Sequence, residues 1–231
     1  MPAKTQQELN GLCRRKVYEA GATVAYEQEK LKYIGCIGKG ILRMRKSLPD
    51  GRDHIVGLLV RGDMFGRVFD GPVHFAIEVA TDAEIYMFSR KGFEDLLTRS
   101  VELERMVLLN ILSELDAARE WMLILANHRT TERLAGFLLV LCRRWTNIAG
   151  VTASSPIRIK MPVSRKDMAQ FLGTRPESIS RAFHALNDDG IIKLNTPHDI
   201  EILDFDALID LSGMEELHED TAIDALRAGG D

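Results

Sequence analysis

The sequence predicts an α+β protein in which a β-rich N-terminal part precedes a long helix and a C-terminal helix-turn-helix. Three observations support this prediction. Short apolar runs separated by glycine-containing turns fill residues 13–89, as in a small barrel or jelly roll. A heptad pattern of apolar residues runs through residues 102–128. Two short amphipathic helices joined by a tight turn occupy residues 164–192.

The β-rich part alternates strand-like runs with turn signals. A turn at LPDG (48–51) and the glycine-rich segment RGDMFG (61–66) interrupt the apolar pattern. Helical structure is expected to begin at RKGFEDLL (90–97). The strands are expected within 33–47, 54–60 and, on either side of a Thr81-Asp82 turn, 75–89.

Apolar side chains in the long helix recur at alternating spacings of three and four residues, which is the a/d seam of a coiled coil. A helix that carries this seam in addition to its contacts with the barrel predicts a homodimer, with Trp121 and Met122 in the dimer core. The alternative is a helix that packs wholly within one monomer. The seam residues are Leu108, Ile111, Leu115, Ala118, Met122 and Leu125.

Three further elements surround the helix-turn-helix. Residues 131–146 are expected to form an amphipathic helix through Leu134, Leu138, Leu141 and Trp145. A strand within 156–164 leads into the motif, and 190–204 is expected to form a β-hairpin wing behind it.

Local signals define the helix-turn-helix itself. Ser164 can cap the first helix, with Asp167 supplying the acid of a capping box three residues later. Gly173 can end this helix with a positive φ, and Pro176 suits the first position of the second helix. The apolar face of the second helix is formed by Ile179, Phe183 and Leu186.

The opposite face of the second helix carries Glu177, Ser180, Arg181 and His184. A helix-turn-helix that presents such donors and acceptors is suited to the DNA major groove. The alternative is that Glu177 and Arg181, spaced i, i+4, form an ordinary surface ion pair.

The distribution of charge favours the DNA hypothesis. The whole chain has a net charge of −4, and residues 1–128 are neutral. Residues 129–198 carry +6, whereas residues 199–231 carry −10. Because phosphate contacts need local positive charge, the acidic C-terminal end hides a basic module that contains the helix-turn-helix.

Several classes of protein are excluded. No apolar run approaches the roughly 20 residues of a membrane span, and the first residues lack a signal-peptide core, so a cytoplasmic protein without membrane association is expected. Cys13, Cys36 and Cys142 lack metal-ligand spacing and are expected to be free thiols. Cys142 precedes two arginines, which would favour a reactive thiolate, but a packed helix favours a buried structural cysteine. Because no nucleophile–base pair or phosphate-binding loop is present, an enzyme is not expected.

The order of these elements, with the segments RGDMFG, ELDAAREWMLIL, TTERLAGFLLVL and SRKDMAQFLGTRPESISR, resembles the CRP/FNR family of bacterial transcription regulators. Within that family the chain is similar to the FNR branch and its FnrL-type members. The resemblance implies a cyclic-nucleotide-binding-like β-roll (1–100), a dimerisation helix (101–128) and a winged helix-turn-helix (129–212). The polar, acidic composition of residues 213–231 predicts a flexible tail.

The resemblance also implies how DNA is read. Glu177, Ser180 and Arg181 look like the signature of the FNR branch, which reads palindromes of the class TTGAT–N4–ATCAA. Arginine can bind guanine O6 and N7 together, glutamate can accept from cytosine N4, and serine can contact a neighbouring thymine. RNA polymerase is the implied protein partner. The expected phosphate contacts are Ser164, Arg165, Arg175, Ser178 and His184.

Departures from the family pattern concern the sensor. Arg67 follows Gly66 where nucleotide-binding members have an acid, and the loop VFDGPVHFA lacks their Arg-Ser/Thr-Ala triplet. The four cysteines of the FNR iron–sulfur cluster cannot be assembled, and its barrel position falls near Tyr86. No cofactor is therefore expected.

Two alternative functions stay open. Haem is one, because His74 and Pro2 resemble the ligands of a haem-binding member of the family. The other is a sensor module that acts on a protein partner, which would have no use for a basic helix-turn-helix.

Overall fold

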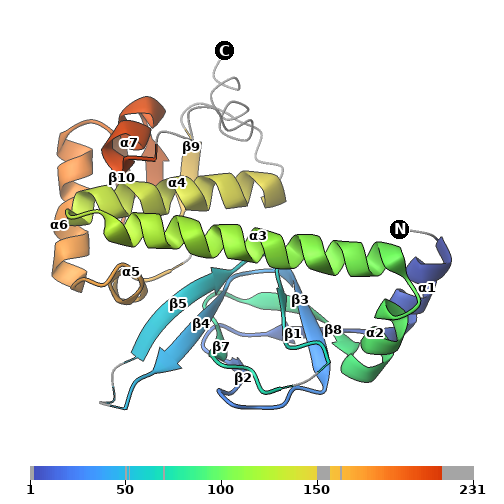
Figure 1. Cartoon of the computed structure of the whole chain (residues 1–231). Coiled ribbons are helices and arrows are strands. Elements are labelled where there is room, and N and C mark those ends of the chain that lie inside the picture. The colour runs from blue at the N-terminus through green and yellow to red at the C-terminus, as the bar shows by residue number, and fades with distance from the viewer. Residues whose placement is uncertain are drawn as a thin grey trace. The chain divides into compact units, whose positions relative to one another are not determined.

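A computed structural model shows two compact units, Met1–Arg119 and Glu120–Asp231 (Figure 1). The predicted acidic tail lies outside the described residues from position 215 onward. The structure describes residues 3–149, 157–161 and 163–214, apart from positions 50, 52 and 70, and the side chains of 144–149 and 160 are also outside it.

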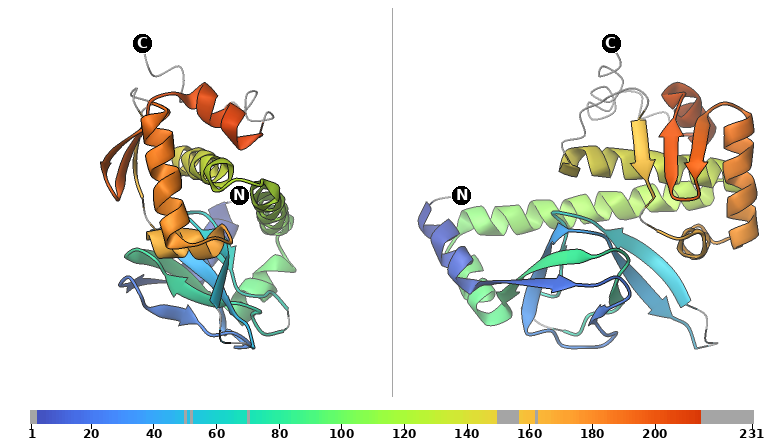
Figure 2. Two further views of the ribbon diagram at one scale, coloured as in Figure 1. Left: turned by 90° about the vertical axis from the view of Figure 1, so that its left-hand side faces the viewer. Right: turned by 180° about the vertical axis from the view of Figure 1, so that it is seen from behind.

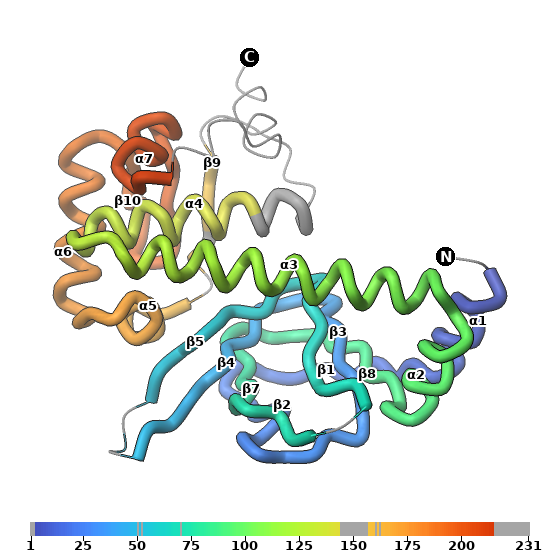
Figure 3. Tube along the Cα trace, viewed as in Figure 1, coloured from blue at the N-terminus to red at the C-terminus, as the bar shows by residue number. Residues whose placement is uncertain are grey.

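The first unit contains the predicted jelly roll, formed by two four-stranded antiparallel sheets. One sheet has the strand order β1-β8-β3-β6, and the other has the order β2-β7-β4-β5. The path of the strands can be followed in Figure 3. The strands are β1 (Cys13–Tyr18), β2 (Thr23–Ala25), β3 (Tyr33–Lys39), β4 (Leu42–Ser47), β5 (Asp53–Leu59), β6 (Met64–Phe65), β7 (Ala76–Val79) and β8 (Ala83–Ser89).

Alternating burial along the strands forms the core of the roll. In β8, Ala83 and Ile85 are buried, whereas the alternate residues Glu84 and Tyr86 face outward. Both sheets contribute to one apolar cluster, so the inside of the roll is filled by side chains. The cluster includes Val24, Leu31, Ile37, Leu42, Leu59, Phe65, Val73, Ile77, Val79 and Ile85.

The predicted strand segment 33–47 forms two strands, β3 and β4, because the chain turns at Gly40. The φ of Gly40 is +87°, and a Cβ there would lie 2.4 Å from the carbonyl oxygen of Asp82. Only glycine fits this turn without displacing the neighbouring backbone.

Three helices begin in the first unit: α1 (Ala3–Leu12), α2 (Arg90–Leu97) and α3 (Val101–Ala126). The sequence analysis did not predict α1, which is mostly polar. It is held by Leu9 and Leu12, which pack against the buried cluster around Phe93 and Leu103. The position of α1 therefore depends on tertiary contacts more than on its own apolar pattern.

The second unit is formed around α4, which packs against α6 and α7. The side chains from Leu134 to Cys142 are buried on all sides of α4, which is typical of a central core helix. The three-stranded sheet β10-β11-β9 includes the predicted wing hairpin, and β10 packs next to α6 (Figure 2). The elements are α4 (Thr130–Ala149), β9 (Ile157–Lys160), α5 (Arg165–Phe171), α6 (Pro176–Asp188), β10 (Ile192–Thr196), β11 (Asp199–Ile202) and α7 (Phe205–Ser212).

Helix α7 was not predicted either, although the sequence contains the signals for its two ends. The Asp204 side chain accepts a hydrogen bond from the backbone N–H of Ala207, and Gly213 ends the helix with a φ of +67°. Leu208 and Ile209 are completely buried. A short helix with both caps therefore follows the predicted wing, in a part of the predicted domain 129–212 for which no element was expected.

None of the helices in the described part of the chain is long and apolar enough to cross a bilayer.

Candidate nucleic-acid interface

The first helix of the helix-turn-helix, α5, begins with the predicted capping box. The backbone N–H of Asp167 donates to Ser164 Oγ at 3.1 Å, and the Asp167 carboxylate accepts from the backbone N–H of Ser164. The Ser164 hydroxyl also donates to Asp167 Oδ2 at 2.9 Å. These bonds satisfy donors that the first turn of a helix otherwise leaves unpaired.

The turn between α5 and α6 has the predicted geometry. Gly173 has a φ of +62°, and the N–H of Thr174 donates to the carbonyl of Ala169 at 2.9 Å. Arg175 is extended, as expected before a proline, and its carbonyl accepts from the N–H groups of Ser178 and Ile179. Pro176 then begins α6.

The two faces of α6 differ sharply. Ile179, Phe183 and Leu186 are buried, and Ala182 lies with them. Of the predicted base-reading residues, Glu177 and Arg181 are exposed and Ser180 is half-exposed, all on the opposite face. The predicted phosphate contacts Arg175 and His184 are exposed, and Ser178 is half-exposed.

The face of α6 that carries Glu177, Ser180 and Arg181, called here the reading face, is largely free of internal interactions. Arg181 Nη2 lies 3.5 Å from Ser178 Oγ, and no ion pair joins Arg181 to Glu177 in the part of the chain that the structure describes. The Ser180 hydroxyl donates to the Pro176 carbonyl at 3.1 Å, which leaves its oxygen able to accept. The guanidinium and carboxylate on this face are therefore available to base edges.

Arg165, a predicted phosphate contact, packs against α6 in this structure. Its guanidinium lies over the Phe183 ring, 3.3 Å from the ring centroid, and burial lowers its pKa to about 10. This cation–π contact joins α5 to α6. Lys166, the next residue in the first turn of α5, is exposed and was not selected from the sequence as a candidate contact.

The predicted seam forms a continuous exposed stripe on α3. Leu108, Ile111 and Leu115 are 45–55% exposed, and Met122 and Leu125 are 63% and 42% exposed. Ala118 is exposed too. Monomeric proteins rarely expose apolar stripes of this length, so the face is suited to a partner surface.

The expectation that Trp121 lies in the dimer core is wrong. Trp121 is 7% exposed, and its ring packs edge-on against Phe171 with a centroid distance of 4.4 Å and against Phe137 at 5.9 Å. It belongs to the core of the second unit, because position 121 lies on the side of α3 that also carries the buried Ile124.

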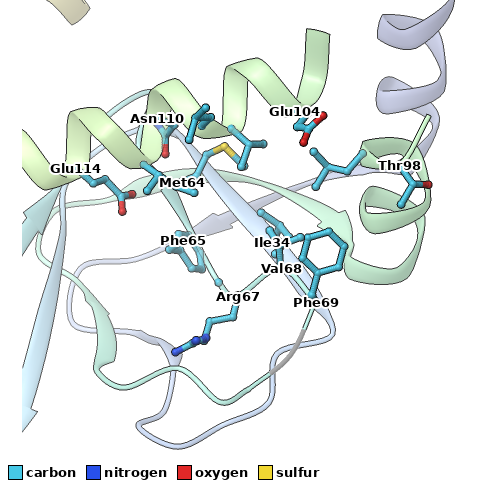
Figure 4. Close-up of a pocket in the computed structure, with 15 residues that line it drawn as sticks. Ile34, Met64, Phe65, Arg67, Val68, Phe69, Thr98, Glu104, Asn110 and Glu114 are labelled. Carbon is cyan, nitrogen blue, oxygen red and sulfur yellow. The ribbon is translucent and has the colours of Figure 1, made fainter. Parts of the chain in front are cut away.

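The first unit contains a mostly apolar pocket of about 750 Å³ between β6, the loop after it, α2 and the first half of α3 (Figure 4). Thr98, Glu104, Asn110 and Glu114 add polar groups to its wall. Two seam residues, Leu108 and Ile111, also line it, so this pocket adjoins the exposed stripe. Its other apolar lining residues are Ile34, Met64, Phe65, Val68, Phe69, Leu97 and Val107.

The roll interior near this pocket is closely packed. The Phe65 ring lies so close to Gly35 that a Cβ there would be 2.2 Å from it, and Tyr33 packs edge-on against the same ring. Arg67 directs its guanidinium away from α3 (Figure 4), and its Nη1 lies 2.6 Å from His74 Nε2. Since a guanidinium can only donate, the exposed His74 ring accepts at Nε2 in this contact.

The three cysteines lie on separate elements. Cys13 is on β1 and Cys36 on β3, both half-buried, whereas Cys142 is buried in α4 of the second unit. Burial raises the pKa of the Cys36 and Cys142 thiols, which opposes the thiolate form that metals and oxidants require. No cluster of metal-ligating side chains occurs among the residues described.

Comparisons with known proteins agree with this architecture. Residues 132–211 match the model of the Crp-like helix-turn-helix domain, and residues 15–100 match the cyclic nucleotide-binding domain. The chain is 33% identical over 196 residues to the transcriptional activator protein FnrL of Cereibacter sphaeroides, covering 85% of this chain and 79% of that one. It is 34% identical over 202 residues to a probable transcriptional activator of Rhizobium leguminosarum bv. viciae, covering 87% and 82%. The structure of FixK2 from Bradyrhizobium japonicum superposes with a TM-score of 0.77 at 28% identity, over 86% of this chain and 96% of that one.

Proposed function

Because the chain belongs to the CRP/FNR family of DNA-binding transcription regulators, which are not enzymes, we propose that it acts as a cytoplasmic homodimer that activates transcription. In this proposal it reads a palindrome of the class TTGAT–N4–ATCAA through Glu177, Ser180 and Arg181. The observation that carries the proposal is the reading face of α6, where the exposed guanidinium of Arg181 has no acidic partner among the described residues.

The dimer is supported by the seam on α3. Five exposed apolar side chains and Ala118 follow the heptad spacing, and pairing two such helices would bury them against each other. A two-fold dimer presents two identical reading helices, so it matches a palindrome. The role as an activator, and hence RNA polymerase as a partner, is supported by the similarity to the transcriptional activator FnrL and to the probable transcriptional activator of Rhizobium leguminosarum bv. viciae.

Footprinting on a promoter fragment that bears this palindrome tests the proposal. We expect both half-sites to be protected in air without added ligand, and a scrambled fragment to stay unprotected. Equal affinity for the palindrome and the scrambled fragment would refute the specificity.

We further propose that DNA binding requires no resident cofactor. Three observations support this proposal. The Phe65 ring packs closely against Gly35, Arg67 donates to His74, and the three cysteine thiols lie on separate elements. The purified protein should lack iron–sulfur absorbance when prepared anaerobically, and cyclic AMP should not raise its melting temperature, because only ligands that prefer the folded state do so. A Soret band that His74→Ala abolishes would show instead that the protein carries haem.

A ligand-responsive regulator of the same fold is the second candidate, because of the pocket beside α3. A small apolar molecule bound there would contact Leu108 and Ile111 and so act directly on the proposed dimer helix. In the footprinting experiment this candidate predicts protection only after the effector has been added.

The two basic residues in the first turn of α5, Arg165 and Lys166, should have different roles. Lys166→Ala should weaken binding to cognate and scrambled DNA alike and reduce the slope of log Kd against log salt by about one, as expected for one lost phosphate contact. Arg165→Ala should instead lower the midpoint of thermal unfolding, because it removes the guanidinium that packs on Phe183. An Arg165→Ala variant with unchanged stability and a reduced salt slope would contradict this assignment.

A further inference from the structure

The C-terminal ends of three helices meet at the turn between α3 and α4. Helix α3 ends at Ala126, α5 ends at Phe171 and α7 ends at Ser212. Two side chains, Asn127 and Arg133, hydrogen-bond to backbone carbonyls at these ends. The carbonyls at a helix C-terminus have no partner within the helix and carry the negative end of its dipole, so they favour a cationic donor.

Arg133 joins two of the three ends. Its Nε donates to the Asn127 carbonyl at 2.9 Å, just after α3, and its Nη1 donates to the Leu172 carbonyl at 3.0 Å, just after α5. The side chain is half-buried. Because the guanidinium is planar and its donors have a fixed geometry, it fixes the two carbonyls relative to each other.

Asn127 adds the third end. Its Nδ2 donates to the Ser212 carbonyl at 2.9 Å, and its backbone N–H donates to the Ile124 carbonyl at 3.3 Å. A chain of hydrogen bonds therefore runs from α7 through Asn127 and Arg133 to α5.

The position of Leu172 connects this series of hydrogen bonds to the helix-turn-helix. Gly173 follows directly, and α6 begins three residues later at Pro176. The middle of this series of hydrogen bonds is at Asn127, which directly follows α3 and lies just after Met122 and Leu125 of the proposed dimer seam. Arg133 thus links the turn that leads into α6 to the end of α3. In the proposed dimer, α3 would set the distance between the two subunits.

We propose that Arg133, oriented together with Asn127, is a positioning residue that fixes the reading helix relative to the end of α3 and thereby determines which half-site spacing the dimer accepts. The inference rests on the proposed homodimer and palindrome. Arg133 contacts no DNA in this proposal; it acts through the carbonyl of Leu172.

The test compares dissociation constants of the full-length protein on palindromes with spacers of three, four, five and six base pairs, and on a single half-site. Arg133→Ala should reduce the preference for the four-base-pair spacer about tenfold, as expected for two lost hydrogen bonds, and leave half-site affinity unchanged. Arg133→Lys keeps the charge but cannot hold two carbonyls in one plane, so it should relax the spacing too.

Arg129→Ala is the matched control. Arg129 lies one helical turn earlier, is 81% exposed and lies 3.9 Å from Glu132, so its loss should leave the spacer preference intact. Circular dichroism and sedimentation would check that each variant is folded and dimeric. The apolar contact between Trp121 and Phe171 remains in all variants and should keep α5 attached. If Arg133→Ala does not fold, Asn127→Ala, which removes the bond to α7 but keeps the backbone carbonyl that accepts from Arg133, should show a smaller relaxation.

An unchanged spacer preference in folded Arg133→Ala and Arg133→Lys dimers would overturn the inference. Equal weakening on all spacers would also overturn it, because that result indicates a lower active fraction and not a change in geometry. A wild-type protein that binds every spacer alike would instead refute the palindrome proposal itself, so the two failures are distinguishable.

Discussion

Arg181→Ala should weaken binding to the TTGAT–N4–ATCAA palindrome by about 1–3 kcal/mol per half-site, or about 2–6 kcal/mol for a dimer on both half-sites. The physical reason is the loss of a guanidinium that can donate to guanine O6 and N7 together. The side chain is exposed and lies 3.5 Å from Ser178 Oγ, so its removal should cost little folding stability.

Competition gel shifts with cognate and scrambled DNA measure this effect. For Arg181→Ala we expect a large loss on the cognate site and a small one on the scrambled site. Lys166→Ala is the control, because it removes a cation from the same motif and should weaken both equally. If Arg181→Ala also weakens both equally, Arg181 contacts phosphate and does not read a base.

Leu115→Glu should convert the protein to a monomer and abolish binding to the palindrome. In the proposed dimer this substitution places two carboxylates against each other in a desolvated seam, at a cost of about 3–5 kcal/mol for each uncompensated charge. The monomer itself should stay folded, because Leu115 is 45% exposed in the isolated chain. Half-site spacing can be read only by a two-fold dimer, so DNA binding should fall with dimerisation.

Sedimentation velocity, with gel shifts on the same samples, measures both consequences. Met106→Glu is the matched control: Met106 is on the same helix and 51% exposed but off the seam, so this variant should stay dimeric. A Leu115→Glu variant that sediments as an unchanged dimer would show that the seam is drawn on the wrong residues.

The helix-turn-helix was predictable because its determinants are local. A capping serine, a glycine with positive φ and a proline at the first helical position act over a few residues, so the sequence pattern contains them. The alternation in β8 and the exposed stripe on α3 were predictable for the same reason.

Other features depend on contacts between distant residues. Helix α1 is held by Leu9 and Leu12 packing against residues near position 93, which no local pattern predicts. Arg165 and Phe183 are separated by eighteen positions, so the sequence alone could not tell a phosphate contact from a packing cation. Trp121 was misplaced because a tryptophan beside an apolar seam can face either side of its helix.

The separation of the two faces of α6 has an evolutionary consequence. Ile179, Phe183 and Leu186 hold the helix in place, whereas Glu177 and Arg181 project into solvent. Mutations at the projecting positions can therefore be nearly neutral for folding while, under the proposed base reading, they change the promoters that are recognised. After gene duplication, a copy of this scaffold could acquire a new regulon through a few solvent-facing substitutions, without first passing through an unstable intermediate.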